Sequence, residues 1–245
     1  MTLNARTCLQ CLCRTWLIGA AMTTRGMQHV GVLYALDPGL QAIYPQTADL
    51  RQARQRYSEH VNTHPFMAPL FIGIMLALEQ QIAQGNVAPE NITALKTTAA
   101  TTLSALGDSF FSGTVLVFWV FSTTLLLQWG HSSLAIALTV LFFVLQAGFR
   151  VGTFFLGVRM GLAALMVLKR MDLINHGEII KLINAILLSI CIWRLFPTVT
   201  HHDLWGPFGV GLAALGVAAF LVARVHVPRY VFPYIFLSCM VFGLL

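Results

Sequence analysis

The chain has 245 residues, of which 57% are hydrophobic and only 10% carry a charge, whereas about 25% are charged in an ordinary soluble domain. So few charges cannot provide the polar surface of a soluble globule, so the composition indicates a membrane protein. The net charge of +6 does not indicate nucleic-acid binding, because the basic residues are scattered and form no dense patch.

The first 64 residues are expected to form amphipathic helices at the membrane interface or in the cytoplasm. At the N-terminus, Leu9, Leu12, Cys13 and Trp16 share one helical face. Such a helix either lies in the membrane interface or packs on the protein's own body, and the pattern leaves both possibilities open. Six arginines and three acids precede Pro65, and this excess of basic residues predicts a cytoplasmic location.

Two further helices are predicted in this front part. One covers residues 27–36 and ends before Asp37-Pro38-Gly39, because proline disrupts a helix interior. The other covers residues 48–61 and places four apolar side chains on one side: Leu50, Ala53, Tyr57 and Val61. Cys8, Cys11 and Cys13 have no fourth ligand nearby, so no metal site is predicted.

Two short apolar segments follow, at 65–78 and 92–106. Both are shorter than the ~20 residues that a membrane-spanning helix needs, which favours re-entrant or buried half-helices. Glu79 is expected to end the first segment in a solvated loop. Gly107-Asp108 is expected to end the second.

Longer apolar helices are predicted at 110–129, 132–149, 150–168, 179–196, 206–223 and 230–245. The boundary near residue 150 leaves open a single span followed by a packed helix. The expected fold is therefore an all-α polytopic membrane protein with N-terminal amphipathic helices, re-entrant hairpin-like segments and about 5–6 transmembrane helices. Residues 65–245 would form its membrane-embedded transport domain.

The first candidate site is Asn62-Thr63-His64-Pro65. Pro65 is expected at the first position of a helix, preceded by residues that cap it. Asn62, Thr63 and His64 have two possible uses here, which are helix capping and hydrogen bonding to a ligand hydroxyl.

The second candidate site lies around Asp108, between Gly107 and Gly113. The glycines are expected to break the helix, and short broken helices at membrane depth form substrate sites in many transporters. An ionisable residue at this depth is a functional candidate, although Asp108 could instead cap the following helix. Arg159 is a possible charge partner of Asp108, or it extends to the membrane interface.

Several of these segments together resemble one family. The motifs, in order, are Gly26-Met27-Gln28, the 62–68 segment Asn-Thr-His-Pro-Phe-Met-Ala, Ala77-Leu78-Glu79, the 106–114 segment Leu-Gly-Asp-Ser-Phe-Phe-Ser-Gly-Thr, and the 157–161 segment Gly-Val-Arg-Met-Gly. Their sequence and order are similar to the IID membrane subunit of the mannose/fructose/sorbose phosphotransferase system (PTS). Ser112 stands where that family usually has tryptophan.

The resemblance implies a function in sugar uptake across a bacterial plasma membrane. A IID subunit assembles with a IIC-type membrane subunit, and a phosphorylated cytoplasmic IIB (IIAB) domain passes phosphate to the translocated hexose. The resemblance implies Asn62, Thr63, His64 and Asp108 as sugar-facing or hairpin-shaping residues. It implies no catalytic residue, phosphorylation site or cofactor. The alternative is a diverged structural or regulatory IID-like subunit without transport.

Overall fold

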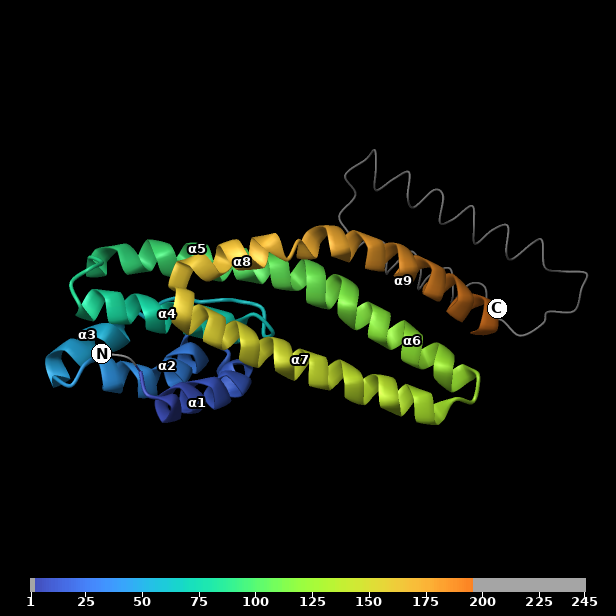
Figure 1. The fold of residues 1–245 in the computed structure, drawn as a ribbon, viewed down its shortest axis with the longest axis horizontal. Helices are drawn as coiled ribbons and strands as arrows, with labels where there is room; N and C mark the ends of the chain where they lie inside the picture. Colours follow the sequence, from blue (N-terminus) through green and yellow to red (C-terminus); the bar gives the residue numbers. More distant parts are fainter. Residues whose placement is uncertain (1–2, 196–245) are drawn as a thin grey trace, which may run out of the picture. The chain divides into compact units, whose positions relative to one another are not determined.

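The computed structural model describes residues 3–195, with side chains to residue 191, and this part is all-α. Its helices are α1 (Ala5–Arg14), the 3₁₀ helix η1 (Thr15–Ala21), α2 (His29–Ile43), α3 (Thr47–Gln55), α4 (Ala68–Ala83), η2 (Pro89–Asn91), α5 (Ile92–Gly107), the π-helix η3 (Asp108–Val115), α6 (Leu116–Gln128), α7 (Ser132–Met160), η4 (Gly161–Ala163), α8 (Ala164–Arg170) and α9 (Leu173–Leu195). Figure 1 shows their arrangement. The predicted spans 206–223 and 230–245 lie outside the described residues, and the predicted domain boundary after residue 64 stays a prediction.

Helix α4 forms the centre of the compact unit Met1–Cys191, and every residue from Ala68 to Glu79 is buried. Its main neighbours are α7 and α2. A Cβ atom on Gly73 would lie 2.4 Å from the Phe154 carbonyl oxygen, so glycine is needed where α4 and α7 cross. The segment is therefore buried inside the protein, but it begins three residues after Pro65, with Pro69 in its first turn.

Helix α1 is amphipathic, and the side chains predicted on its apolar face differ in burial. The Asn4 side chain accepts a hydrogen bond from the Thr7 amide and caps the helix. The buried face contains Cys8, Cys11 and Leu12 and packs against α2 and η1. Leu9 and Trp16, which were expected on the same face as Leu12, are 56% and 55% exposed. The helix thus packs on the body and also presents a second apolar edge to the outside.

Helix α2 does not end before Asp37 as predicted, because it continues through Pro38 to Ile43. A proline inside a helix leaves the carbonyl four residues earlier without its usual amide donor. Here that carbonyl belongs to Tyr34, and Nη1 of Arg14 donates to it at 3.0 Å. The Arg14 guanidinium also lies 4.4 Å from the centre of the Tyr34 ring. A side chain from α1 therefore compensates for the missing donor.

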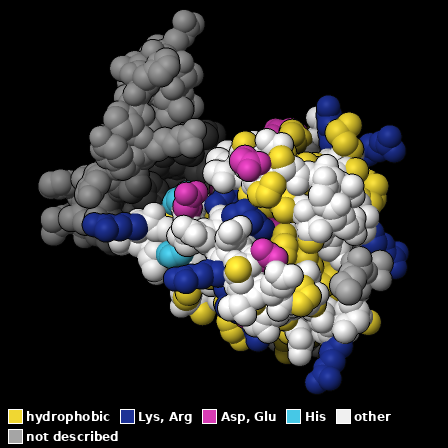
Figure 2. All heavy atoms as spheres, turned by 90° about the vertical axis from the view of Figure 1, so that its left-hand side faces the viewer, with side chains coloured by type: hydrophobic (Ala, Val, Ile, Leu, Met, Phe, Trp, Pro, Cys, Tyr) yellow, Lys and Arg dark blue, Asp and Glu magenta, His cyan; other side chains and the backbone are white. Residues whose placement is uncertain are grey.

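Helix α3 ends at Gln55, six residues before the predicted end. Three of the four side chains expected on its apolar side, Ala53, Tyr57 and Val61, are nevertheless buried. Figure 2 looks onto the end of the molecule that carries α3 and the α4–α5 turn. Lys, Arg, Asp and Glu side chains are spread over this end among hydrophobic ones, as on a surface that faces water.

Three described helices are long and apolar enough to cross a membrane: Pro89–Gln128, Ser132–Arg170 and Leu173–Cys191. The first joins α5, η3 and α6 without interruption, so the helix continues past Gly107 and Gly113 and changes only its hydrogen-bonding pattern there. The second contains no break near residue 150, which confirms the alternative of one span followed by a packed helix. The described chain is therefore an all-α membrane protein.

Candidate functional site

Two segments that resemble family motifs lie side by side at the start of the site. The amide of Gln28 donates to the Val61 carbonyl at 2.9 Å, and the amide of Val61 donates to the Gly26 carbonyl at 3.3 Å. The Gln28 side chain continues this pairing, because its Nε2 donates to the Thr63 carbonyl and its Oε1 accepts from the Thr63 amide. The two segments thereby fix the backbone that leads into His64.

His64 connects this pair to a third motif segment on η3. Its Nδ1 accepts a hydrogen bond from the Phe66 amide at 3.2 Å, so Nδ1 carries no proton in this arrangement. The neutral ring then holds its proton on Nε2, which donates to the Ser112 hydroxyl at 2.9 Å. The imidazole also stacks on Phe111, with ring centres 5.7 Å apart. His64 thus joins the 62–66 segment to the π-helix.

Gly107 permits this contact because a Cβ atom there would lie 2.2 Å from Cβ of His64. The glycine therefore serves close packing at the end of α5. The π-helix begins at the next residue, and the Thr114 hydroxyl donates to the Ser109 carbonyl five residues earlier at 2.9 Å. Single π-helical turns inside α-helices occur often at functional sites.

Burial and a nearby charge act in opposite directions on the pKa of His64. Burial lowers the pKa of His64, and the negative charge of Asp108 opposes this shift. Asp108 itself is exposed on the first residue of η3. Arg159 is also exposed, and no ion pair joins it to Asp108 among the described residues.

Asn62 lines a hollow of about 190 Å³ between the 60–62 segment and α5. The other residues around it are His60, Val61, Lys96, Thr97, Ala100, Thr101 and Ser104. The adjacent Thr63 hydroxyl is buried and has no hydrogen-bond partner within residues 3–191. Amide and hydroxyl groups of this kind suit an uncharged polar ligand, since they both donate and accept hydrogen bonds.

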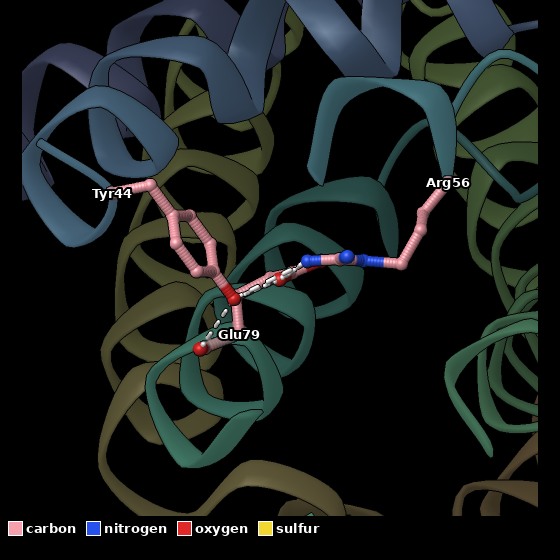
Figure 3. A network of polar contacts seen from close by, with 3 residues as sticks. All are labelled: Tyr44, Arg56 and Glu79. Atoms are coloured by element: carbon pink, nitrogen blue, oxygen red, sulfur yellow. Dashed lines mark hydrogen bonds and ion pairs between the residues drawn. The ribbon is translucent and has the colours of Figure 1, made fainter. Parts of the chain in front are cut away.

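The expectation of a solvated Glu79 is wrong. Its side chain is 0% exposed near the C-terminal end of α4, where it forms an ion pair with Arg56 (Figure 3). Nε of Arg56 donates to Oε1 of Glu79 at 3.1 Å, and the Tyr44 hydroxyl donates to Oε2 at 2.8 Å. Burial, followed by the negative charge of Glu79, raises the pKa of Tyr44 and keeps its hydroxyl as a donor.

Lys96 extends this buried cluster to α5. Its Nζ donates to the Arg56 carbonyl at 2.6 Å and lies 3.7 Å from the Glu59 carboxylate. One sequence signal for this arrangement was available. Leu78 and Ile82 are four residues apart and would lie on the same face of a helix. This spacing indicates that the helix continues past Glu79, so that Glu79 belongs to the helix and not to the following loop.

The family description "PTS system mannose/fructose/sorbose family IID component" matches residues 2–196. The mannose-specific EIID component of Escherichia coli strain K12 is 36% identical over 91 residues, which are 36% of this chain and 32% of that protein. The fructose permease IID component of Bacillus subtilis strain 168 is 27% identical over 136 residues, 55% of this chain and 48% of that protein. The alignments thus span about a third of the first relative and about half of the second.

Two solved structures have a similar fold. One is described as a membrane protein and has a TM-score of 0.74 at 22% identity, with 99% of this chain and 97% of that chain covered. The other is a complex of the mannose transporter ManYZ with microcin E492. It has a TM-score of 0.55 at 24% identity and coverages of 99% and 96%.

Proposed function

We propose, from the premise that this chain belongs to the mannose/fructose/sorbose PTS family of IID components, that it translocates a hexose together with a IIC-type membrane subunit. The energy source would be phosphoenolpyruvate, and a phosphorylated IIB (IIAB) domain would transfer phosphate to the sugar. The complex would be a hetero-oligomer in a bacterial plasma membrane and would cross it several times. A mannose-specific and a fructose-specific relative support a hexose as substrate.

The observation that carries this proposal is the meeting of three motif segments at His64. They are separated in the sequence, yet Gln28 holds Thr63 and His64 holds Ser112. The 62–64 segment and η3 therefore form one unit, with Asn62 and Asp108 at its accessible edges. Such a unit suits a path along which a polar, uncharged solute must exchange water for protein hydrogen bonds.

The proposed roles of the site residues follow from their exposure. Asn62 and Asp108 would hydrogen-bond sugar hydroxyls directly, because both side chains are accessible. Thr63 and His64 are buried, so they contribute by shaping the segment, with the Thr63 hydroxyl as a remaining donor. Gly107 leaves the space that His64 occupies, and Pro65 and Gly113 would shape the backbone around these residues. We assign no catalytic or phosphorylated residue to this chain, because the phosphate passes from the IIB domain to the sugar.

The test is hexose uptake in a PTS-deficient bacterium that expresses this chain with its own IIC and IIAB subunits. Uptake of labelled mannose and fructose should appear with the complete set and disappear when this chain alone is omitted. An assembled complex that takes up no sugar would contradict the proposal and favour a structural or regulatory IID-like subunit.

A further inference from the structure

We propose that α1 and η1 form an anionic-phospholipid-binding surface at the level of Arg150. The surface is defined as the exposed apolar side chains Leu9, Trp16, Leu17 and Met22, together with Arg6, Arg14 and Arg25. This inference concerns how the protein meets the lipid and does not depend on the sugar-transport function.

The depth of Arg150 follows from helix geometry. From Ser132 to Phe149, α7 carries no Asp, Glu, Lys or Arg, and Arg150 is the next charged residue. Those 18 residues span about 27 Å, close to the ~30 Å hydrocarbon thickness of a bilayer. Ile136, Phe143 and Leu145 on this stretch are 65%, 58% and 63% exposed, as side chains that face lipid would be.

The neighbouring helix agrees with this depth. Between Asp108 and Gln128 no residue is charged, and these 20 steps correspond to about 30 Å. The α6–α7 turn carries the half-exposed Trp129, an aromatic residue typical of a membrane interface. These lengths place Asp108 and Arg150 near one membrane interface and the α6–α7 turn near the other. Figure 1 shows this turn at the far end of α6 and α7.

Arg150 ties η1 to that interface. Its Nη2 donates to the Thr15 carbonyl at 3.3 Å, and its guanidinium lies 3.9 Å from the centre of the Trp16 ring. Arg150 is 5% exposed and forms no ion pair among the described residues, so η1 supplies its polar and aromatic partners. The depth of η1, and of α1 before it, is thereby set by a residue on a membrane-spanning helix.

The chemistry of the surface selects anionic lipid. Tryptophan and leucine side chains that remain exposed at the interface level bury their apolar parts between headgroups. The first 36 residues contain three arginines and no acid, since Asp37 is the first carboxylate in the chain. The negative surface potential of anionic phospholipids attracts basic residues at this depth.

The test uses the full chain in nanodiscs, with a single spin label at Leu9→Cys or Leu17→Cys and native cysteines replaced. Electron paramagnetic resonance would measure label collision with oxygen, which concentrates in lipid, and with a water-soluble nickel complex. Ile136→Cys provides the hydrocarbon reference, and the exposed Asn86→Cys provides the water reference. We expect both N-terminal labels to fall between the references, nearer to Ile136→Cys.

Two results would overturn the lipid surface. Nickel access equal to that of Asn86→Cys would place α1 and η1 in water. An immobilised label that neither reagent reaches, in a complex with a IIC subunit, would show that a protein partner covers this surface instead.

Lipid charge is tested by comparing phosphatidylcholine nanodiscs with and without phosphatidylglycerol. Arg6→Gln and Arg25→Gln should each reduce the preference for phosphatidylglycerol, measured by native mass spectrometry of bound lipid, by about fivefold. Arg51→Gln, which removes an exposed arginine on α3, should leave the preference unchanged. Equal effects of all three substitutions would contradict a localised lipid surface.

Discussion

The two ends of α4 are buried by opposite means. At the N-terminal end, His64, Ser112 and the surrounding backbone form a neutral hydrogen-bonded junction. At the C-terminal end, Glu79 is a fully buried carboxylate held by Arg56 and Tyr44. A buried charge is stable only when its partners compensate it fully, which commits those groups to structure. The neutral end needs fewer partners and leaves polar groups next to a hollow. We therefore expect stability to depend mainly on the charged C-terminal end of α4 and transport on the neutral N-terminal end.

The largest effect should come from breaking the charged end. Arg56→Ala would leave Glu79 buried without its cation, at a cost of about 3–5 kcal/mol in the free energy of unfolding. Denaturant unfolding in detergent micelles would measure it. Adding Glu79→Gln to Arg56→Ala should recover part of the loss, because the uncompensated charge is then removed.

The control for that change is Arg51→Ala, which removes an exposed arginine from α3 and should leave the free energy of unfolding nearly unchanged. If Arg56→Ala cost no more than Arg51→Ala, the charged cluster would not stabilise α4.

The close packing of the neutral end is tested by Gly107→Ala. The added methyl group would overlap His64, and overpacking of this kind costs about 1–3 kcal/mol. Gly148→Ala is the matched control, because a Cβ there meets nothing within 4 Å and alanine is the better helix former. The midpoint temperature of thermal unfolding should therefore fall for Gly107→Ala, and it should stay unchanged or rise slightly for Gly148→Ala. Identical shifts for the two variants would contradict the close packing at Gly107.

The hydrogen bond at the neutral end is tested by Ser112→Ala. The Nε2 proton of His64 would lose its acceptor, and because this hydrogen bond is only partly buried the cost should be about 0.5–1.5 kcal/mol. Ser109→Ala, an exposed position on the same π-helix, is the control and should cost little. Chemical unfolding of the two variants would measure the difference, and equal costs would argue against the His64–Ser112 bond.

A pH dependence should be specific to the neutral end. Burial lowers the pKa of His64 in the folded protein, although the charge of Asp108 opposes this. The unfolded chain then takes up the proton more readily, so the contribution to stability is complete above about pH 6.5 and decreases as the pH falls towards the folded pKa. The unfolding midpoint of His64→Gln, followed against pH, should change less over this range than that of wild type. The prediction would be contradicted if the midpoint of His64→Gln depended on pH in the same way as that of wild type.

The smallest effect is expected for an ion pair that is not buried. Nη2 of Arg54 lies 2.7 Å from Oδ1 of Asp37, and the two side chains are 42% and 23% exposed. Asp37→Asn should therefore cost only about 0–1 kcal/mol. A loss as large as that of Arg56→Ala would mean that burial does not distinguish the two ion pairs.

Local patterns in the sequence predicted part of the fold. The short segment 92–106 appears as α5 from Ile92 to Gly107, because it contains no glycine or proline before Gly107 that would interrupt a helix. The sequence singled out the motif segments around His64 and Ser112 as candidates, but nothing in their spacing showed that a hydrogen bond would join them across 48 positions.

The errors arose where a distant side chain changed the local outcome. The helix was expected to end before Asp37-Pro38, but it continues because Arg14 supplies a donor to the Tyr34 carbonyl from 20 positions away. Glu79 was expected in water, but Arg56 and Tyr44 approach it from 23 and 35 positions away. Gly107 was expected to break a helix, whereas it serves packing against His64. Such compensation depends on tertiary contacts, which one sequence does not display.

The most direct test of the division between the two ends is the initial rate of hexose uptake per assembled complex, comparing Asp108→Asn with Asp37→Asn. We predict that Asp108→Asn lowers the rate by about 10- to 100-fold, since a charged hydrogen bond to a sugar hydroxyl is worth about 1.5–3 kcal/mol, while Asp37→Asn retains the wild-type rate. Equal rates for the two variants, with assembly intact, would contradict the placement of the sugar path at the His64 end of α4.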